Sequence, residues 1–197
     1  YQRECQMPKY AMEKDFEAAL ACLRQGGVIA YPTEAVFGLG CLPDAAGAIA
    51  RILAMKRRPV DKGLILIAAE FALLEAYLLP LPSEIAERVR PTWPGPVTWT
   101  LPARPEVPRR LRGDHADLAV RVTAHPIAAA LSQAVAAPLV STSANPADLP
   151  PARSATEVAG YFAPPGQPDY ILPGALGGQA QPTEIRAGRT GTLLRPA

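Results

Sequence analysis

The sequence predicts a single α/β domain built on a mixed parallel and antiparallel sheet flanked by helices. Apolar runs of strand length alternate with amphipathic segments along the first half of the chain, a pattern typical of α/β folds. In the second half, short strands follow one another more closely, as they do in hairpins. No internal repeat and no long linker divides the 197 residues, a length that supports one hydrophobic core.

Five helices are expected where apolar periodicity meets a start or stop signal. Asp44 and Ser83 are suitable N-terminal caps, because their side-chain oxygens can accept from the free N–H groups of a first turn. Pro126 suits the first position of a helix, and Gly26 suits a helix end. The expected helices cover residues 15–26, 45–56, 70–79, 84–90 and 127–135.

Eight strands are expected from runs of β-branched and other apolar residues. GLILIA at 63–68 is continuously apolar, which is typical of a strand buried on both faces. The segment PTEAVFGLGC follows the first strand and is expected to be a loop, because it contains Gly38 and Gly40. The expected strands cover residues 28–31, 63–68, 97–101, 118–122, 138–143, 170–172, 183–187 and 191–195.

Composition excludes several classes of protein. Twenty basic residues against 18 acidic ones give a net charge of +2, which excludes a strongly basic nucleic-acid tail and an acidic disordered chain. Three cysteines without C-x-x-C spacing predict neither a disulfide framework nor a cysteine zinc site, and they suit a reducing cytoplasm. The sequence shows neither a membrane-spanning apolar run nor the apolar stretch of a signal peptide.

The chain is expected to have two parts. Residues 1–14 are interpreted as an N-terminal extension, either disordered or added in cloning, and residues 15–197 as the domain. Since the chain begins with Tyr1, Met7 and Met12 are both candidates for the native start.

Positive charge is segregated along the chain. Segments 51–62, 104–121 and 184–197 carry net charges of +4, +2 and +2. A nearly neutral protein with this distribution can present one basic face to an anionic partner. Arginine outnumbers lysine by 16 to 4. That ratio suits anionic ligands, which arginine binds bidentately, but a GC-rich genome is the simpler cause of the bulk excess.

Three polar segments border the expected strands, where α/β proteins often bind ligands. Thr33-Glu34 follows the first strand, and a turn in which Thr33 caps its own backbone is the preferred interpretation of this segment alone. The loop at 56–62 holds four cations in seven residues, which is more than a helix end needs and suits a triphosphate. Ser-Thr-Ser-Ala-Asn at 141–145 either binds phosphate or ribose oxygens or forms an ordinary turn.

Arg121 lies inside an apolar strand and needs an anionic partner, because burying an unpaired charge is expensive. That partner is either a structural carboxylate, such as Asp114 or Asp117, or the carboxylate of a ligand, and the sequence leaves both open. His115 and His125 lack metal-ligand spacing, and His125 is interpreted as part of a helix start. The sequence has no G-x-x-x-x-G-K-[ST], G-x-G-x-x-G or G-x-S-x-G motif, so a bound nucleotide would not use a Walker loop.

Five segments taken together resemble the YrdC-like family. In chain order they are YPTEAVFGLG, KRRPVDKGLIL, WPGPVT, LAVRV and STSAN, and the resemblance covers nearly the whole chain after residue 15. The family pattern of Lys-x-Arg followed far downstream by Ser-x-Asn is met by Lys56, Arg58, Ser143 and Asn145. Within the family, the chain resembles the short bacterial form of the L-threonylcarbamoyladenylate synthases.

The resemblance implies a fold and a reaction. The fold is a twisted α/β sheet with an open, basic, concave face. The reaction is that of a cytoplasmic nucleotidyltransferase, which forms threonylcarbamoyl-AMP and pyrophosphate from L-threonine, bicarbonate or CO2, and ATP with Mg2+. Proteins of a threonylcarbamoyl-transferase complex then modify the adenosine next to the anticodon in tRNAs that read codons beginning with A.

The resemblance also implies roles for single residues. Lys56 and Arg58 are expected to be catalytic. Arg121 would bind the threonine carboxylate, and Thr33 and Thr183 would also contact threonine. No dedicated metal site is expected in the protein. The expected ATP and adenylate ligands are Lys56, Arg58, Lys62, Ser141, Ser143, Asn145 and Arg195.

Two departures from the family pattern concern the threonine and phosphate sites. Many long members have Asn-Pro where this chain has Lys62-Gly63, and a threonine-contacting His where it has Ile67. Both differences occur in the short bacterial form. The chain either binds threonine less tightly or uses another group in place of the histidine, and the sequence leaves both open.

Two other functions compete with this interpretation. A non-catalytic module could bind double-stranded RNA or tRNA through its basic face, but this would not explain the hydroxyl-rich segment at 141–145 or the apolar surroundings of Arg121. Carbamoyl transfer in hydrogenase maturation uses a related domain, yet it needs acylphosphatase and zinc-finger-like regions for which this chain has neither the length nor the cysteines.

Overall fold

The computed structural model describes residues 9–196. These residues form one mixed sheet of nine strands in the order β7-β1-β2-β6-β3-β5-β4-β8-β9. The pairs β1–β7, β3–β5 and β4–β8 are parallel, and the other neighbours are antiparallel. The strands are β1 (Ile29–Pro32), β2 (Phe37–Gly40), β3 (Ile65–Ala68), β4 (Val97–Pro102), β5 (Asp117–Val122), β6 (Leu139–Ser143), β7 (Tyr170–Ile171), β8 (Glu184–Ala187) and β9 (Leu193–Arg195).

Short helices connect the strands, and two of them begin with a side-chain cap. His125 precedes α5, and its ring accepts a hydrogen bond from the Ala128 N–H. Ser154 caps α6 by accepting from the Glu157 N–H. The helices are α1 (Lys9–Arg24), α2 (Ala46–Met55), α3 (Ser83–Val89), α4 (Arg109–Arg112), α5 (Pro126–Ala134) and α6 (Ala155–Tyr161), with 3-10 turns η1 (Val60–Lys62), η2 (Phe71–Tyr77) and η3 (Arg90–Thr92).

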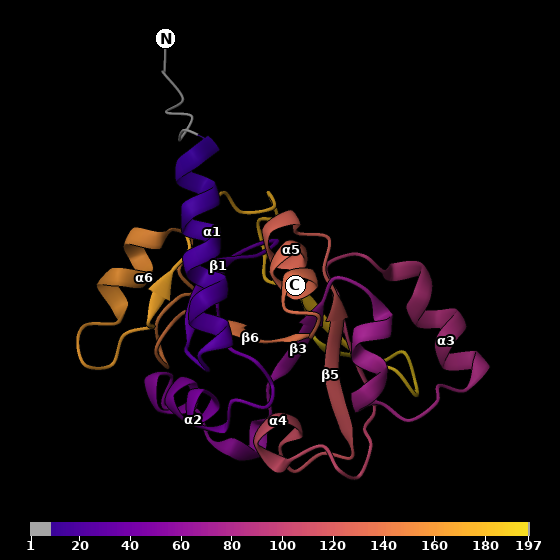
Figure 1. The fold of residues 1–197 in the computed structure, drawn as a ribbon. Coiled ribbons are helices and arrows are strands. Elements are labelled where there is room, and N and C mark those ends of the chain that lie inside the picture. The colour runs from indigo at the N-terminus through magenta and orange to yellow at the C-terminus, as the bar shows by residue number, and fades with distance from the viewer. Residues whose placement is uncertain (1–8, 197) are drawn as a thin grey trace.

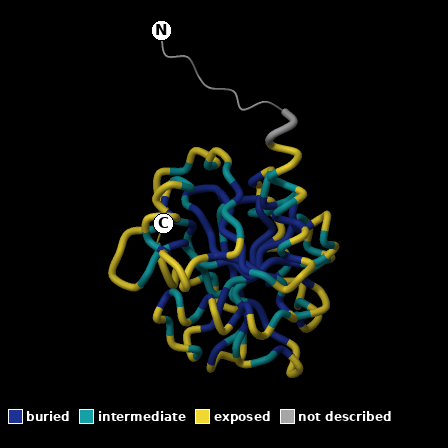
Figure 2. The backbone as a smooth tube through the Cα atoms, turned by 60° about the vertical axis from the view of Figure 1, so that its left-hand side comes forward, coloured by how far each residue is buried: buried dark blue, intermediate teal, exposed yellow. Residues whose placement is uncertain are grey.

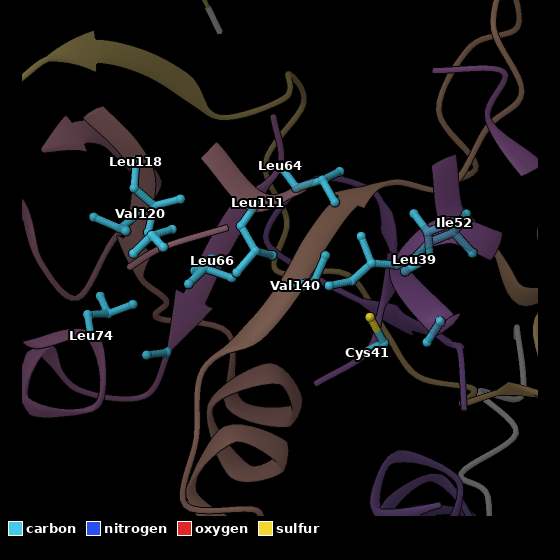
Figure 3. Close-up of a cluster of buried hydrophobic side chains, with 14 of the residues drawn as sticks. Leu39, Cys41, Ile52, Leu64, Leu66, Leu74, Leu111, Leu118, Val120 and Val140 are labelled. Atoms are coloured by element: carbon cyan, nitrogen blue, oxygen red, sulfur yellow. The ribbon is translucent and has the colours of Figure 1, made fainter. Parts of the chain in front are cut away.

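Two clusters of buried side chains lie on opposite faces of the sheet. Because side chains alternate along a strand, Leu66 of β3 belongs to the larger cluster and Ile67 to the smaller one. The larger cluster includes Ile52 of α2 and is shown in Figure 3. The smaller cluster lies under α1 and α5, which stand side by side in front of the sheet (Figure 1). Figure 2 shows that buried segments lie toward the centre of the molecule and that exposed segments surround them.

Each of the eight predicted strands overlaps an observed strand, and the mixed sheet confirms the predicted α/β fold class. The prediction of a loop for PTEAVFGLGC was wrong, because β2 occupies Phe37–Gly40. Glycine is required in this strand rather than in a turn. A Cβ at Gly40 would overlap the Val140 carbonyl oxygen and lie 2.7 Å from the Tyr31 ring.

The predicted caps Asp44 and Ser83 were also wrong. The turn before α2 places Ala45 at the N-cap position, and Pro82 holds that position before α3, so neither predicted side chain forms a cap bond. Residues 70–79 form the 3-10 helix η2 rather than an α-helix.

The short helices α4 and α6 lie outside the predicted ones, and α1 begins at Lys9 rather than at residue 15. Residues 9–14 of the expected N-terminal extension are therefore helical, and residues 1–8 lie outside the described part of the chain. No described helix combines the length and the apolar character needed to cross a membrane.

Candidate functional site

A cavity of about 590 Å³ opens on one face of the sheet. Five segments that are far apart in the sequence line it, within residues 33–38, 56–65, 119–121, 141–151 and 181–196. A volume of this size suits a small-molecule ligand. The polar segments that the sequence analysis selected separately therefore meet in one space.

The sheet topology explains this convergence. Strand β6 lies between β2 and β3 and runs antiparallel to both, so its C-terminal end lies beside the starts of those two strands. Ser143 is opposite Gly38 of β2, and Ser141 is opposite Ile65 of β3. Strand β5 continues the row, with Ala119 opposite Ile65. Opposite residues share a face of the sheet, so Ser141, Ile65 and Ala119 form a floor beneath the cavity.

Small residues keep the floor low at Ser141, Ala119 and the neighbouring Gly38. Gly38 has no side chain, and a Cβ there would lie 3.3 Å from Ser141 Oγ and 3.5 Å from Thr33 Cγ2. Thr33 is buried and donates its hydroxyl hydrogen to the Val36 carbonyl at 2.7 Å. The predicted turn at Thr33 is therefore confirmed, and the same residue also lines the cavity.

Lys56 follows α2 and reaches across to the end of β6. Its Nζ donates to the backbone carbonyl oxygens of Ser143 at 2.5 Å and Asn145 at 2.8 Å, and lies 3.2 Å from Asn145 Oδ1. The ammonium is buried, and no carboxylate between residues 9 and 196 pairs with it. Burial, with a smaller contribution from nearby Arg58, lowers the pKa of Lys56 to about 8. The Asn145 amide nitrogen also donates to the Leu149 carbonyl at 2.7 Å.

Four more cations surround Lys56 at the cavity, namely Arg57, Arg58, Lys62 and Arg195. Arg58 donates to the Gly63 carbonyl at 3.1 Å, and Arg195 donates to the Thr183 carbonyl at 2.7 Å. Burial lowers the pKa of both guanidinium groups, and repulsion from other cations contributes at Arg195. So many like charges in one cavity favour a strongly anionic ligand.

Arg121 also lines the cavity, and its partner is Glu34. Its Nη2 donates to Glu34 Oε2 at 3.2 Å, and its Nη1 donates to the hydroxyls of Thr98 at 3.1 Å and Thr183 at 2.8 Å. Both charged side chains are only 5% exposed. The guanidinium thus joins the turn after β1 to β4 and to the segment before β8.

The suggested structural partners of Arg121 were wrong. Asp114 pairs with Arg109 and Asp117 pairs with Arg189, both at the surface. Sequence reasoning missed Glu34 as the partner, along with Thr98 and the floor residues Ile65 and Ala119. The one available signal was that Glu34 is an acid directly after an apolar strand, a position that a turn explains equally well.

The structure brings all of the predicted site residues to this cavity: Thr33, Lys56, Arg58, Lys62, Arg121, Ser141, Ser143, Asn145, Thr183 and Arg195. Ile67 does not line it. Ile67 is fully buried in the smaller core cluster, opposite Arg121 in the register of β3 and β5. Within residues 9–196, His, Cys, Asp and Glu form no group of three or more that could hold a metal ion.

Comparison with known proteins places these features in a wider context. Residues 21–197 match the model of the Sua5, YciO and YrdC family, which carries the description "Telomere recombination". The chain is 58% identical to the threonylcarbamoyl-AMP synthase of Halorhodospira halophila, over 90% of this chain and 92% of the relative. It is 51% identical to the protein of the same name from Escherichia coli O6:H1, over 90% of this chain and 93% of the relative.

Two solved structures resemble this one closely. P. abyssi Sua5 complexed with L-threonine superposes with a TM-score of 0.81 at 34% identity, over 92% of this chain and 53% of that one. The chain therefore spans about half the length of P. abyssi Sua5. E. coli YciO gives a TM-score of 0.80 at 28% identity, over 93% of this chain and 89% of that one.

Proposed function

Because the chain belongs to the Sua5, YciO and YrdC family, we infer that it is a threonylcarbamoyl-AMP synthase, a nucleotidyltransferase of tRNA modification. Relatives of that name are more than half identical to it over nine tenths of its length. It forms threonylcarbamoyl-AMP and pyrophosphate from L-threonine, bicarbonate or CO2, and ATP.

One observation carries the chemical part of this proposal. One cavity is lined by residues from three separate parts of the chain, namely Lys56 and Arg58, then Ser141, Ser143 and Asn145, and finally Arg121. A cluster of cations suits the phosphates of ATP, and a buried guanidinium beside hydroxyls suits the carboxylate of an amino acid. A module that only binds RNA would need neither the enclosed floor nor the buried guanidinium.

The cationic end of the cavity acts on ATP. Lys56, Arg58, Lys62 and Arg195 bind the phosphates and offset the negative charge that builds up as pyrophosphate leaves. Ser141, Ser143 and Asn145 hold oxygens of the nucleotide or of the adenylate product. Lys56 also fixes the end of β6 through its bonds to the carbonyl oxygens of Ser143 and Asn145. Lys56 and Arg58 are therefore the proposed catalytic residues.

The other end of the cavity binds threonine. Arg121 holds the carboxylate, with Thr33 and Thr183 beside it, which leaves the amine free to add to CO2 and form a carbamate. A carbamate oxygen then attacks the α-phosphorus, and the bond from that phosphorus to the oxygen of the leaving pyrophosphate breaks. The protein's contribution is to bring these groups together in the correct orientation.

Other aspects of the function follow from the same proposal. Mg2+ would accompany ATP and would be held mostly by phosphate oxygens and water. Residues 15–197 form the catalytic domain, and the enzyme acts in the cytoplasm. Its product passes to proteins that transfer the threonylcarbamoyl group to tRNA, and the basic face can contact that RNA.

The test is the release of pyrophosphate by the purified protein. We expect release only when ATP, L-threonine and bicarbonate are all present, with threonylcarbamoyl-AMP identified by mass spectrometry. Lys56→Ala lowers turnover about 100-fold or more, whereas Lys14→Ala, at an exposed lysine of α1, leaves it unchanged. Pyrophosphate release that does not depend on threonine, or salt-sensitive RNA binding without any release, would refute the proposal.

A further inference from the structure

We propose that Glu34 is a positioning residue that orients the Arg121 guanidinium toward the threonine carboxylate. This inference rests on the proposed function and assigns a role to a residue that does not line the cavity. Five observations carry it: the contacts of the Glu34 carboxylate, the fixed backbone around it, the contacts of Arg121, the location of the two side chains relative to the cavity, and the contrast with the surface ion pairs.

The Glu34 carboxylate is held by three donors in the interior. Its Oε1 accepts from the Thr123 hydroxyl at 2.6 Å and from the Ala124 N–H at 3.2 Å. Its Oε2 accepts from Arg121 Nη2 at 3.2 Å. Only 5% of the side chain is exposed. Oε1 is thus fixed by the protein, and this places Oε2 at one end of the guanidinium.

The backbone around Glu34 is fixed as well. The Gln179 N–H donates to the Glu34 carbonyl at 3.1 Å, and the Gly177 N–H donates to the Thr33 carbonyl at 3.1 Å. A side chain at Gly177 would collide with the Glu34 backbone, since a Cβ there would lie 2.9 Å from Glu34 Cα. The carboxylate therefore sits on a rigid turn, as a positioning residue must.

The other contacts of Arg121 cannot fix the guanidinium alone. Thr98 and Thr183 are neutral hydroxyls, both at Nη1, and each can rotate about its own side-chain bond. All three bonds have the charged guanidinium as donor, but only the bond to Glu34 also has a charged acceptor, so it alone adds the attraction between opposite charges. Glu34 is the one carboxylate among the described residues within ion-pair distance of Arg121. Of the five guanidinium hydrogens, these three bonds leave one on Nη2 and one on Nε without a partner among the described residues, and Nε is buried.

The two residues of the ion pair lie differently relative to the cavity. Arg121 lines the cavity, and Glu34 lies behind it with both carboxylate oxygens occupied. A negative charge at the cavity wall would repel a carboxylate ligand, but behind Arg121 its effect is to hold the cation in place. Glu34 therefore acts on threonine through Arg121 and not by contact.

The other ion pairs of the described chain do not have this arrangement. Asp169 accepts from Arg51 and from the Val28 N–H, so its partners are of the same kinds as those of Glu34. The Arg51–Asp169 pair is 45% and 40% exposed, and neither residue lines the cavity. Asp169→Asn is therefore a matched control that removes a structural carboxylate without affecting Arg121.

The experiment measures steady-state kinetics of pyrophosphate release for Glu34→Gln. We expect the KM for threonine to rise about tenfold or more, while the KM for ATP stays within about twofold of the wild-type value. In the Arg121→Gln background, Glu34→Gln should change threonine affinity by less than about twofold, because its effect requires the guanidinium. Asp169→Asn should lower thermal stability and leave both KM values unchanged.

Each result decides the matter. A folded Glu34→Gln variant with an unchanged threonine KM overturns the inference. So does a double variant in which Glu34→Gln weakens threonine affinity by the same factor as it does in the wild-type background. If Glu34→Gln does not fold, Thr123→Val replaces it. This variant keeps the ion pair but removes the 2.6 Å donor to Glu34, and an unchanged threonine KM again overturns the inference. If the wild-type protein shows no threonine-dependent pyrophosphate release, the proposed function is wrong and the inference about Glu34 is wrong with it. If the wild-type protein is active and the Glu34→Gln variant keeps its threonine KM, only the inference about Glu34 is wrong.

Discussion

Lys56 shows at the scale of one residue how the fold changes the chemistry of a side chain. Burial lowers its pKa from 10.5 to about 8, which corresponds to a cost of about 3 kcal/mol for the charged form. The folded chain binds this proton more weakly than the unfolded chain, so the cost is full below about pH 8 and is relieved between about pH 8 and 10.5. Such a cost is typical of residues kept for function.

The same pKa predicts a pH dependence of ATP binding. Phosphates stabilise the ammonium of Lys56, so ATP affinity should fall about tenfold between roughly pH 7 and pH 9 as the free enzyme loses this proton. Calorimetry in buffers of different ionisation enthalpy should show proton uptake on binding near pH 8. Lys56→Met should bind ATP weakly at every pH. An equally steep decline in this variant would show that another group is responsible.

Arg121 predicts a large effect on stability. Arg121→Ala leaves Glu34 buried without a cation, which should lower the free energy of unfolding by about 3–5 kcal/mol, measured by urea denaturation. Arg189→Ala breaks the surface pair with Asp117, in which Arg189 is 57% exposed, and should cost less than about 1 kcal/mol. Equal losses in the two variants would contradict the importance of burial. Arg121→Gln also removes the cation, but its amide can still donate a hydrogen bond to a carboxylate, so it is the better variant for measurements of threonine binding.

At the scale of elements, strand β2 contains two glycines that are needed for different structural reasons. Gly40 allows Tyr31 and the Val140 carbonyl to approach the strand, whereas Gly38 keeps the cavity floor low beside Thr33 and Ser141. The strand was predicted as a loop because glycine usually marks turns. In this sheet, glycine instead marks a close approach of neighbouring groups.

The two glycines predict opposite phenotypes. Gly40→Ala forces a backbone collision, so the free energy of unfolding should fall by about 3 kcal/mol. Gly38→Ala meets its neighbours at 3.3 and 3.5 Å, so its stability should change by only about 1 kcal/mol, while threonine-dependent turnover falls because the methyl group narrows the cavity. Denaturation curves and pyrophosphate release distinguish the two. A stable, fully active Gly38→Ala variant would show that a methyl group at position 38 does not obstruct the ligand.

At the scale of the whole molecule, charge is concentrated at the cavity. Six of the 20 basic residues line it: Lys56, Arg57, Arg58, Lys62, Arg121 and Arg195. This leaves 14 basic residues against 18 acidic ones elsewhere in the chain. The small net charge of +2 is therefore the sum of a positive cavity and a negatively charged remainder. The positive potential of the cavity attracts anions.

This distribution predicts that salt weakens ATP binding more than threonine binding. Raising the ionic strength from about 0.05 to 0.5 M should lower ATP affinity about tenfold, because the cavity is open to solvent and its charges are partly screened. Threonine has no net charge, so its affinity should change by less than about threefold. Titration calorimetry at the two salt concentrations measures both. Equal salt dependence of the two ligands would contradict an electrostatic origin of ATP binding.

The sequence alone determined the local features. The apolar run at 63–68 predicts β3, and His125-Pro126 predicts the start of α5, because strand burial and helix capping depend on neighbouring residues. The cations at 56–62 and the hydroxyls at 141–145 could likewise be selected as ligand candidates from their composition. The segments that carry the family resemblance include both groups, and four of the five segments line one cavity, whereas WPGPVT does not.

The tertiary structure decided which of these residues meet. Glu34 and Arg121 are 87 positions apart, and nothing near either residue distinguishes Glu34 from Asp114 or Asp117 as the partner. The pairing depends on the strand order, which carries the turn after β1 to the buried end of Arg121 and leaves the two aspartates to surface arginines. Ion pairs between distant segments follow from topology, because a charge binds whichever opposite charge the fold brings near it and shields from water.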